Sequence, residues 1–460
     1  MSNLGDALIL ALKSRLATVA VADDTESLTG ADLIGRAEDI ARALAAEGAR
    51  ADEPVLLACS NRAADVAGFL GIWIAGAVAV PIHRRATPAT RDRVLMLSAA
   101  RLALDGGPGG LTVHPVTAPA RPMLSDAATI VFTSGSTGEP KGVVLAHDRL
   151  MAKINSVDSE LGFDAGERIY TSLQLTFIFG QWVTFLTLLK GGQVILDEKF
   201  RPAEAPRMFA DRRIDRVAAV PTMLRAMMPH LDGAPAFAGH VMSGGEILPA
   251  ALSAQVRAAW PGVRLWDLYG LTETGGCDFI VRPAEHDAAA GTIGTLWPGI
   301  DCRVEPETHE LQIRTPYRML GYLDQPDHTA ATFDGDWCRT GDMGAIRDDG
   351  RVMLTGRLKD LINRAGNKIA PVEVERAVES HPDVAGALAV GLPDPRTGEA
   401  VHLFVVLRPG VDLAADAIRD WAGERLEPYK LPDRVHFGDS LPVGGTGKTD
   451  RRALRELLQD

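Results

Sequence analysis

Two glycine-rich turns carry the residues of this sequence that are best suited to phosphate chemistry. The first turn, Thr133 to Gly142, reads Thr-Ser-Gly-Ser-Thr-Gly-Glu-Pro-Lys-Gly and directly follows an apolar run. Glycines let the backbone approach phosphate oxygens, hydroxyls and amides donate hydrogen bonds to them, and Lys141 supplies a point charge. A polar surface turn is the alternative. Four hydroxyl residues and three glycines around one of only nine lysines favour a phosphate-binding loop.

The second turn, Pro442 to Thr449, nearly matches the pattern of a P-loop, with Pro442 in place of the first glycine. Only 12 residues follow Lys448, which is too few for the helix and core strands that a P-loop enzyme builds after this motif. We therefore expect Lys448 to be delivered to a site formed by another part of the chain. The alternative is a solvated lysine near the C-terminus.

The elements that must position these turns follow an α/β pattern with mostly parallel sheets. Apolar spacing predicts helices over 31–47 and 64–75, and strands at 55–58, 78–81, 129–133, 193–196, 216–220, 240–243 and 264–268. Short strands and many turns over 311–350 predict a small β-rich section. We therefore expect a large N-terminal domain over residues 1–356, built of mixed sheets flanked by helices.

A new α/β unit begins after Gly356. Its apolar pattern predicts helices at 371–380 and 414–426 and strands at 384–390 and 401–408. We expect residues 357–460 to form a smaller α+β C-terminal domain.

Composition excludes several classes of protein. The 460 residues carry a net charge of −12, which argues against nucleic acid as a partner. The four cysteines lie far apart, which is typical of a reducing compartment and of neither a disulfide framework nor a thiolate zinc site. The N-terminus lacks a signal-peptide layout, and the uncharged run Val66–Ile82 is shorter than a membrane span. We read that run as a buried helix leading into a strand, and expect a cytoplasmic protein without a membrane span.

The turn at 133–142 closely resembles the signature of the adenylate-forming superfamily, which comprises acyl-CoA synthetases, luciferases and the adenylation domains of peptide synthetases. The match runs from about residue 30 to the end, and the stretch before the signature is shorter than usual, which predicts a trimmed N-terminal subdomain. Further motifs match in the family's order: Ser243–Glu246, Tyr269–Thr274, Arg339–Asp342, Gly356–Asp360 and Gly447–Lys448.

The resemblance implies a reaction in which a carboxylate and ATP give acyl-AMP and pyrophosphate, and a thiol then captures the acyl group. The carboxylate is already a nucleophile, so the enzyme mainly supplies positioning and charge neutralisation. Thr272 would donate to the α-phosphate, and Glu273 would bind the Mg²⁺ that bridges phosphate oxygens; an exposed turn carboxylate is the alternative for Glu273. The β- and γ-phosphates would be held by Thr133, Ser134, Gly135, Ser136, Thr137, Gly138 and Lys141.

The same resemblance places the adenosine. Asp342 would accept both ribose hydroxyls, although an aspartate in Thr-Gly-Asp is also a common turn former. Arg357 would reach the ribose or a phosphate, and Tyr269 would stack on the adenine. The residues implied to wall the adenine are Ser243–Glu246 and Tyr269, and the cofactor-binding set of this region is Gly244, Gly245, Glu246, Tyr269 and Gly270.

By resemblance, Lys448 is the catalytic residue that bridges the substrate carboxylate and the α-phosphate. Lys359 occupies the family's hinge position. The C-terminal domain would be mobile: it presents Lys448 for adenylation, then rotates to present the face of residues 364–369 for thiolation. Gly366 would leave room for the pantetheine arm of coenzyme A in a thiol tunnel. An ordinary turn glycine is the alternative.

The acyl pocket is expected around Phe177, Phe179, Gly180 and Trp182, with Gly270 and Gly275. Phe177 stands where many acyl-CoA synthetases and luciferases have histidine, and the aspartate that pairs with amino-acid substrates is absent. Two aromatics before Gly180 resemble benzoate-type CoA ligases, as does Gly-Glu-Ile-Leu-Pro at 245–249. This favours a compact aryl or cyclic acid, with plain core packing of the aromatics as the alternative.

The sequence thus predicts an AMP-forming acyl- or aryl-CoA ligase that uses ATP, Mg²⁺, coenzyme A and a small-molecule carboxylate, as a monomer or homodimer. A stand-alone adenylation enzyme that loads the phosphopantetheine of a separate carrier protein is the alternative. A non-catalytic nucleotide-binding regulator is a third possibility, and it predicts decay at Lys448, Glu273 or Asp342. All three residues are present.

Overall fold

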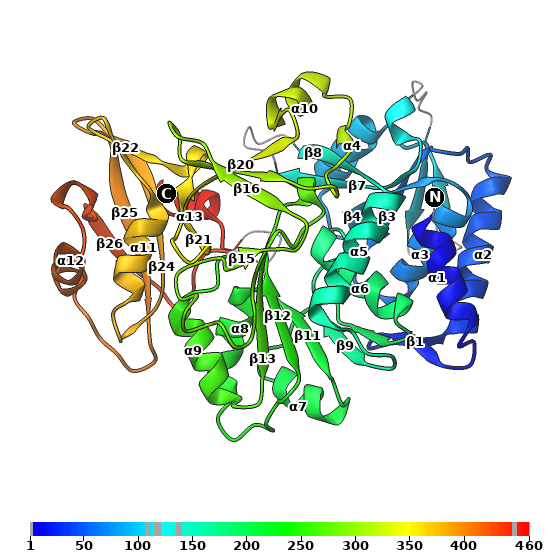
Figure 1. The fold of residues 1–460 in the computed structure, drawn as a ribbon, viewed down its shortest axis with the longest axis horizontal. Helices are drawn as coiled ribbons and strands as arrows, with labels where there is room; N and C mark the ends of the chain where they lie inside the picture. Colours follow the sequence, from blue (N-terminus) through cyan, green and yellow to red (C-terminus); the bar gives the residue numbers. More distant parts are fainter. Residues whose placement is uncertain (1–2, 106–110, 115–120, 135–139, 444–448, 460) are drawn as a thin grey trace.

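The chain folds into two parts built on four β-sheets (Figure 1). The computed structural model describes residues 3–105, 111–114, 121–134, 140–443 and 449–459. Three sheets belong to the larger, N-terminal part on the right and centre of Figure 1, and the fourth belongs to the C-terminal part on its left. This arrangement confirms the predicted fold class of a large α/β N-terminal domain and a smaller C-terminal domain.

The largest sheet has nine strands, and its central pairs are parallel, as the α/β pattern predicts. The antiparallel strands lie at its two ends. In spatial order the strands are β15 (Thr295–Leu296), β14 (Phe279–Val281), β13 (Arg264–Tyr269), β12 (His240–Gly244), β11 (Arg216–Ala219), β9 (Arg168–Thr171), β10 (Gln193–Leu196), β1 (Val19–Ala22) and β2 (Ser27–Thr29).

A seven-stranded sheet carries the first glycine-rich turn between its strands β7 and β8. Strands β3 and β4 are almost continuously buried, because parallel strands covered on both faces are apolar throughout. The spatial order is β18 (Gly321–Tyr322), β8 (Pro140–Ala146), β7 (Ala127–Ser134), β4 (Val78–His83), β3 (Pro54–Cys59), β5 (Leu102–Asp105) and β6 (Leu111–Val113).

Helices cover both sheets, and α6 and its neighbour α5 lie between them in Figure 1. Helix α2 begins at a capping box, in which Thr29 and Asp32 each bond the other's backbone N–H. The helices of this part are α1 (Leu4–Lys13), α2 (Gly30–Ala46), α3 (Ala63–Ile74), α4 (Pro88–Ser98), α5 (His147–Leu161), α6 (Ile178–Leu189), α7 (Ala205–Asp211), α8 (Pro221–Met227), α9 (Ala250–Ala259) and α10 (Pro326–Thr332).

The predicted β-rich section forms a small five-stranded sheet, which we call the bridging sheet because its last strand leads into the C-terminal part. The turn η4 (Leu358–Asp360) separates that strand from the C-terminal sheet. The strands of the bridging sheet are β16 (Asp301–Val304), β17 (Glu310–Arg314), β19 (Phe333–Asp334), β20 (Trp337–Ile346) and β21 (Val352–Arg357).

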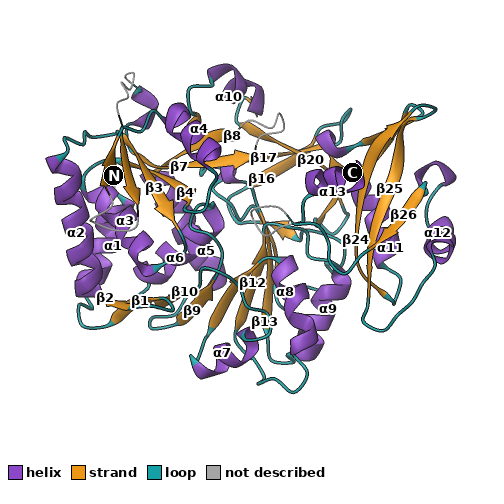
Figure 2. Cartoon of the chain, turned by 180° about the vertical axis from the view of Figure 1, so that it is seen from behind, coloured by secondary structure: helices purple, strands orange, loops and turns teal. Residues whose placement is uncertain are grey.

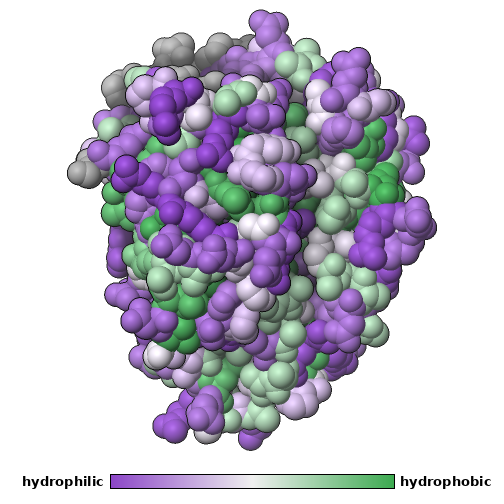
Figure 3. Space-filling view, turned by 90° about the vertical axis from the view of Figure 1, so that its left-hand side faces the viewer, coloured by the Kyte–Doolittle hydropathy of each residue, from purple (hydrophilic) through white to green (hydrophobic). Residues whose placement is uncertain are grey.

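The C-terminal sheet is covered on both faces (Figure 2). Helices α11 (Pro371–Glu379) and α12 (Ala415–Gly423) share one apolar cluster with it, while α13 (Arg451–Gln459) contacts the opposite face. Figure 3 views the molecule from the C-terminal side and shows polar and apolar residues interspersed over this surface. The strands are β22 (Ile362–Arg364), β23 (Asn367–Ile369), β24 (Val384–Asp394), β25 (Gly398–Leu407) and β26 (Arg434–Phe437).

Some helices and strands end at residues other than the predicted ones. Strand β24 continues beyond the expected Val390 to Asp394, because it pairs with β25 along its whole length. Helix α12 ends at Gly423 rather than at Leu426. Among the described residues, no helix combines the length and the apolar character needed to cross a membrane.

Candidate active site

Three side chains predicted to bind adenosine meet at one carboxylate. Asp342 in β20 is buried, and its Oδ2 accepts a hydrogen bond of 2.5 Å from the hydroxyl of Tyr269, at the end of β13. The Nε of Arg357, the last residue of β21, lies 2.6 Å from the other carboxylate oxygen. Burial and the charge of Asp342 raise the pKa of Tyr269, so the phenol stays protonated and donates. The structure therefore brings Tyr269, Asp342 and Arg357 together from two sheets.

Glu273 lies in the 3-10 turn η3 (Thr272–Thr274), directly after β13. Its Oε1 accepts a hydrogen bond of 2.8 Å from the hydroxyl of Tyr322, and its backbone carbonyl accepts one from the N–H of Met319. Glu273 and Thr272 are both half-buried. A carboxylate that accepts one side-chain hydrogen bond retains lone pairs for a cation, and Mg²⁺ in phosphate sites commonly uses only one or two carboxylates. The residue thus fits the magnesium role predicted for it.

Lys141 in β8 is buried and touches His328 of α10, with its Nζ in hydrogen-bond contact with His328 Nε2. The Nζ also lies 5.4 Å from the centre of the Tyr322 ring. Burial lowers the pKa of Lys141, while the charge of Glu273 raises it. Thr133 lies directly opposite Lys141 in the β7–β8 ladder. Two of the predicted phosphate-binding residues are therefore neighbours, with Glu273 close enough to act on the lysine.

A second lysine, Lys153 of α5, anchors the segment that follows Glu273. It is 1% exposed, and its Nζ donates a hydrogen bond of 2.6 Å to the carbonyl of Cys277 and lies 3.9 Å from Asp278. Asp278 in turn accepts hydrogen bonds from the Thr274 hydroxyl and the Leu271 N–H. Since these contacts hold both ends of the segment 271–278, they fix the turn that carries Thr272 and Glu273.

The aromatic residues predicted for the acyl pocket lie at the start of α6. Phe179 and Trp182 are stacked, with ring centres 5.2 Å apart, and Trp182 is 2% exposed. A Cβ on Gly244 would lie 3.1 Å from the Phe179 ring. Phe177 is the half-buried residue just before the helix. Phe179 therefore faces the end of β12, where the predicted adenine-binding segment begins.

Close backbone packing explains two glycines of the predicted pocket. A Cβ on Gly270 would lie 2.2 Å from the backbone nitrogen of Cys277, and one on Gly180 would lie 2.5 Å from the carbonyl oxygen of Gln174. A Cβ on Gly275 would point to Tyr317 and Lys153, whereas Gly276 is the glycine that lies opposite Trp182. The pocket role of Gly275 remains a prediction.

Glu246, predicted to bind adenine, is held by hydrogen bonds within the protein. Its carboxylate accepts from the N–H and hydroxyl of Thr222 and from the N–H of Thr449. Gly245, before it, has a positive φ of 83°. Through the bond from Thr449, the C-terminal part thus contacts the large part at Glu246, in the segment predicted to bind the nucleotide.

Two further predicted residues lie near the passage between the two parts. Lys359 is exposed in η4, where the chain leaves the bridging sheet. Gly366 and Ala365 form the two-residue turn between β22 and β23, with φ values of 83° and 52°. Apart from the glycine and its two chain neighbours, no atom of the described residues lies within 4 Å of a Cβ placed on Gly366. The hinge, the thiol tunnel and the domain boundary at 356/357 remain predictions.

Some predicted residues lie outside the described part of the chain: Gly135, Ser136, Thr137, Gly138 and Lys448. The backbone of Ser134 is described as the end of β7.

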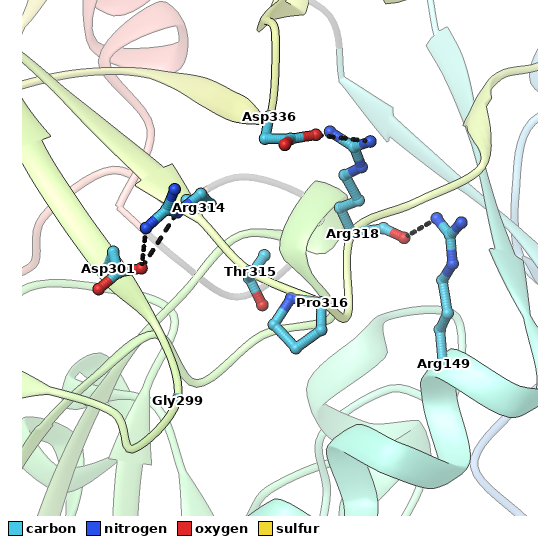
Figure 4. A pocket seen from close by; sticks show the side chains of 8 residues that line it. All are labelled: Arg149, Gly299, Asp301, Arg314, Thr315, Pro316, Arg318 and Asp336. Carbon is cyan, nitrogen blue, oxygen red and sulfur yellow. Dashed lines mark hydrogen bonds and ion pairs between the residues drawn. The ribbon is translucent and has the colours of Figure 1, made fainter.

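A pocket of about 460 Å³ opens beside the bridging sheet (Figure 4). Its arginines are already engaged: Arg314 pairs with Asp301, Arg318 with Asp336, and Arg149 donates to the Arg318 carbonyl. Among the described residues predicted for the active site, none lines this pocket.

The predicted site lies at the carboxyl ends of β12 and β13, which is where open α/β sheets bind ligands. A buried carboxylate, a buried lysine and a second carboxylate are the groups predicted to bind a ribose, a phosphate and a cation in a nucleotide-using enzyme of the adenylate-forming class. The AMP-binding enzyme family model matches residues 11–108 and 105–323, and the model of the AMP-binding enzyme C-terminal domain matches residues 373–448. The chain belongs to the AMP-binding enzyme family.

Curated relatives cover most of the chain. A feruloyl-CoA synthase from an Amycolatopsis species is 31% identical over 469 residues, which covers 95% of each chain. The 3-[(3aS,4S,7aS)-7a-methyl-1,5-dioxo-octahydro-1H-inden-4-yl]propanoyl:CoA ligase of Rhodococcus jostii is 30% identical, also over 95% of each chain. Fatty acid–[acyl-carrier-protein] ligase ScoC of Streptomyces coeruleorubidus is 34% identical over 71% of this chain and 66% of its own length.

Solved structures share the whole architecture. A benzoate CoA ligase from Burkholderia xenovorans has a TM-score of 0.85 at 26% identity, covering 99% of this chain and all of that one. The anthranilate CoA ligase AuaEII, in complex with anthranoyl-AMP, has a TM-score of 0.85 at 24% identity, covering 99% and 97%.

Sequence reasoning missed three residues of this site: Tyr322, His328 and Lys153. Each lies outside the motifs and meets its partner through a contact distant in the sequence. The one usable signal was the scarcity of lysine, which singles out Lys153 as much as Lys141.

Proposed function

We propose that this enzyme uses ATP to convert a carboxylic acid into acyl-AMP and then transfers the acyl group to the thiol of coenzyme A. The observation that carries the proposal is the carboxylate of Asp342, held by Tyr269 and Arg357 beside the turn that contains Glu273. The relatives named above, which include CoA ligases aligned over 95% of the chain, support the same reaction.

In the first half-reaction, a carboxylate oxygen of the acid attacks the α-phosphorus, and the bond to the bridging oxygen breaks to release pyrophosphate. Asp342 orients the nucleotide through the ribose, and Lys141 neutralises charge on the phosphates that leave. Lys448 stabilises the charge that develops between the carboxylate and the α-phosphate. Glu273 would hold Mg²⁺, which would supply further charge neutralisation at the phosphate oxygens.

In the second half-reaction, the thiol sulfur attacks the acyl carbonyl carbon, AMP leaves, and the thiol proton passes to solvent. The C-terminal domain turns about Lys359 between the two steps, and Gly366 leaves space for the pantetheine arm. The thiol acceptor is coenzyme A. A carrier-protein phosphopantetheine is the second candidate, which the likeness to ScoC favours.

The acid is a compact aryl or cyclic carboxylate. The stacked pair Phe179 and Trp182 supports this, because flat rings bind well against flat rings. The names of the relatives point in the same direction, since they include feruloyl, benzoate and bicyclic propanoyl CoA ligases. We further propose a cytoplasmic enzyme that works as a monomer or homodimer.

A pyrophosphate-release screen tests the proposal. Aliphatic, aryl and cyclic acids are each supplied with ATP and Mg²⁺, alone, with coenzyme A, or with a holo-carrier protein. We expect release with aryl or cyclic acids and thioester formation with coenzyme A. The variant Lys448→Ala is expected to lower adenylation at least about 100-fold and to retain thiolation of a supplied acyl-adenylate. Equal loss of both half-reactions would contradict the role of Lys448.

A further inference from the structure

We infer that Glu246 is the docking residue that holds the end of the C-terminal domain in the arrangement used for adenylation. The inference rests on the proposed function, in which Lys448 acts on the α-phosphate. It gives Glu246 a positioning role that is distinct from the adenine contact predicted for it.

The carboxylate of Glu246 accepts hydrogen bonds from both parts of the enzyme. From the large part, Thr222 donates its N–H at 3.1 Å and its hydroxyl at 2.8 Å. From the C-terminal part, the N–H of Thr449 donates at 2.6 Å, and its hydroxyl lies 3.4 Å away. A carboxylate has two oxygens and four lone pairs, so Glu246 can serve both parts at once. Hydrogen bonds to a charged acceptor are also the stronger kind.

Thr222 aims the carboxylate. It is the second residue of α8, which begins just beyond the end of β11, and it contacts both Oε atoms of Glu246. The same helix provides Arg225, whose Nε would lie 3.6 Å from a Cβ on Gly386 of β24. Helix α8 therefore supports Glu246 through Thr222 and lies close to the C-terminal domain at Arg225.

Thr449 is well connected to the C-terminal domain. It forms an isolated antiparallel bridge with Val443, and the next residue donates its N–H to the carbonyl of Pro442. Arg451, at the start of α13, forms two 2.7 Å contacts with Glu375. Because these contacts tie Thr449 to its neighbours in the C-terminal domain, a bond to Thr449 also holds the end of that domain. Lys448 is the residue directly before Thr449 in the sequence.

The inference is tested by separating the two half-reactions. Adenylation is followed as pyrophosphate release in a single turnover, and thiolation as thioester formed from a supplied acyl-adenylate and coenzyme A. We expect Glu246→Ala to slow adenylation about 10-fold or more and to change thiolation less than about two-fold, because only adenylation needs the docked arrangement. Thr449→Pro removes the N–H donor and should have the same effect.

Two variants serve as comparisons. Glu246→Gln keeps an acceptor oxygen without the charge, so its adenylation rate should fall less than that of Glu246→Ala. The comparison of the two variants also guards against an effect of misfolding. Arg452→Ala removes an exposed pair with Glu456 on α13 and should leave both rates unchanged. Equal loss in both half-reactions, or no loss in either, would overturn the docking role.

The test also distinguishes this role from the proposed function. If the wild-type enzyme formed no adenylate with any acid, the proposed function would fail, and domain docking would then be assessed by small-angle scattering of wild type and Glu246→Ala. A larger radius of gyration for the variant is expected from the docking role. Identical scattering would overturn it.

Discussion

The hydroxyl of Tyr269 donates a 2.5 Å hydrogen bond to Oδ2 of Asp342 and so joins the nine-stranded sheet to the bridging sheet. Tyr269 ends β13, and Asp342 lies within β20, 73 residues later. Arg357 contacts the other oxygen of the same carboxylate. The carboxylate is therefore oriented before any nucleotide arrives, which lowers the entropy cost of binding.

Removing this carboxylate should weaken nucleotide binding strongly. We expect Asp342→Ala to raise the KM for ATP about 10- to 100-fold, because it removes a charged acceptor and leaves Arg357 without its partner. Tyr269→Phe should raise it several-fold. Steady-state pyrophosphate release measures both values. Asp301→Ala, which breaks an exposed pair with Arg314, is the control and should not change the KM. An unchanged KM in Asp342→Ala would refute the ribose role.

Glu273 should set the magnesium requirement. We expect Glu273→Gln to raise the Mg²⁺ concentration at half-maximal rate about 10-fold or more, since an amide is a poorer ligand for a hard cation than a carboxylate. Tyr322→Phe removes only the 2.8 Å hydrogen bond to Oε1 and should shift the curve less. The measurement is the rate as a function of Mg²⁺ at saturating ATP. Superimposable curves for wild type and Glu273→Gln would exclude the role.

The aromatic residues before and within α6 should decide which acid is used. We expect Phe177→His and Phe179→Ala to change the ranking of acids by kcat/KM, because both alter the shape of the predicted pocket. A fully buried ring elsewhere provides the matched control: Phe209→Leu, in a separate apolar cluster, should lower stability without changing the ranking. If the ranking were the same in every variant, the pocket would have to lie elsewhere.

Asp267 should make stability depend on pH. Burial raises the pKa of this carboxyl to about 8, so the folded protein retains a proton that the unfolded chain releases near pH 4. The folded state binds more protons over this range, and its stability therefore falls as pH rises from about 4 to about 8. In Asp267→Asn the side chain is always neutral. The Tm of the variant minus that of wild type should increase between about pH 5 and about pH 8.5, and a constant difference would contradict the shifted pKa.

Much of the fold could be predicted because the apolar patterns are local. The strand at 193–196 was predicted with the ends that the structure shows, and the run at 66–82 is a buried helix and strand as expected. The ends of β24 and α12 were predicted less well. They depend on pairing and packing with distant partners, which leave no mark on the local pattern.

The residues of the candidate site also divide into those that sequence motifs indicate and those that depend on contacts distant in the sequence. Tyr269, Asp342 and Arg357 belong to motifs and were named as candidates from the sequence, and the structure brings their side chains together. Tyr322 was not found, because a single tyrosine in a two-residue strand carries no periodic signal. The bond between Glu246 and Thr449 joins residues 203 positions apart, and no spacing rule connects them.

The turn η4 has a practical consequence for engineering. The bridging sheet ends with Arg357 and the C-terminal sheet begins with Ile362, and no described strand pairs across that point. A single junction placed there cuts no pair of hydrogen-bonded strands, so we expect residues 362–459 to be transferable as a unit onto the large part of another family member. Whether the two parts of such a chimera dock correctly should then depend on a few contacts between them. The foremost is an acidic side chain on the recipient that accepts a hydrogen bond from Thr449.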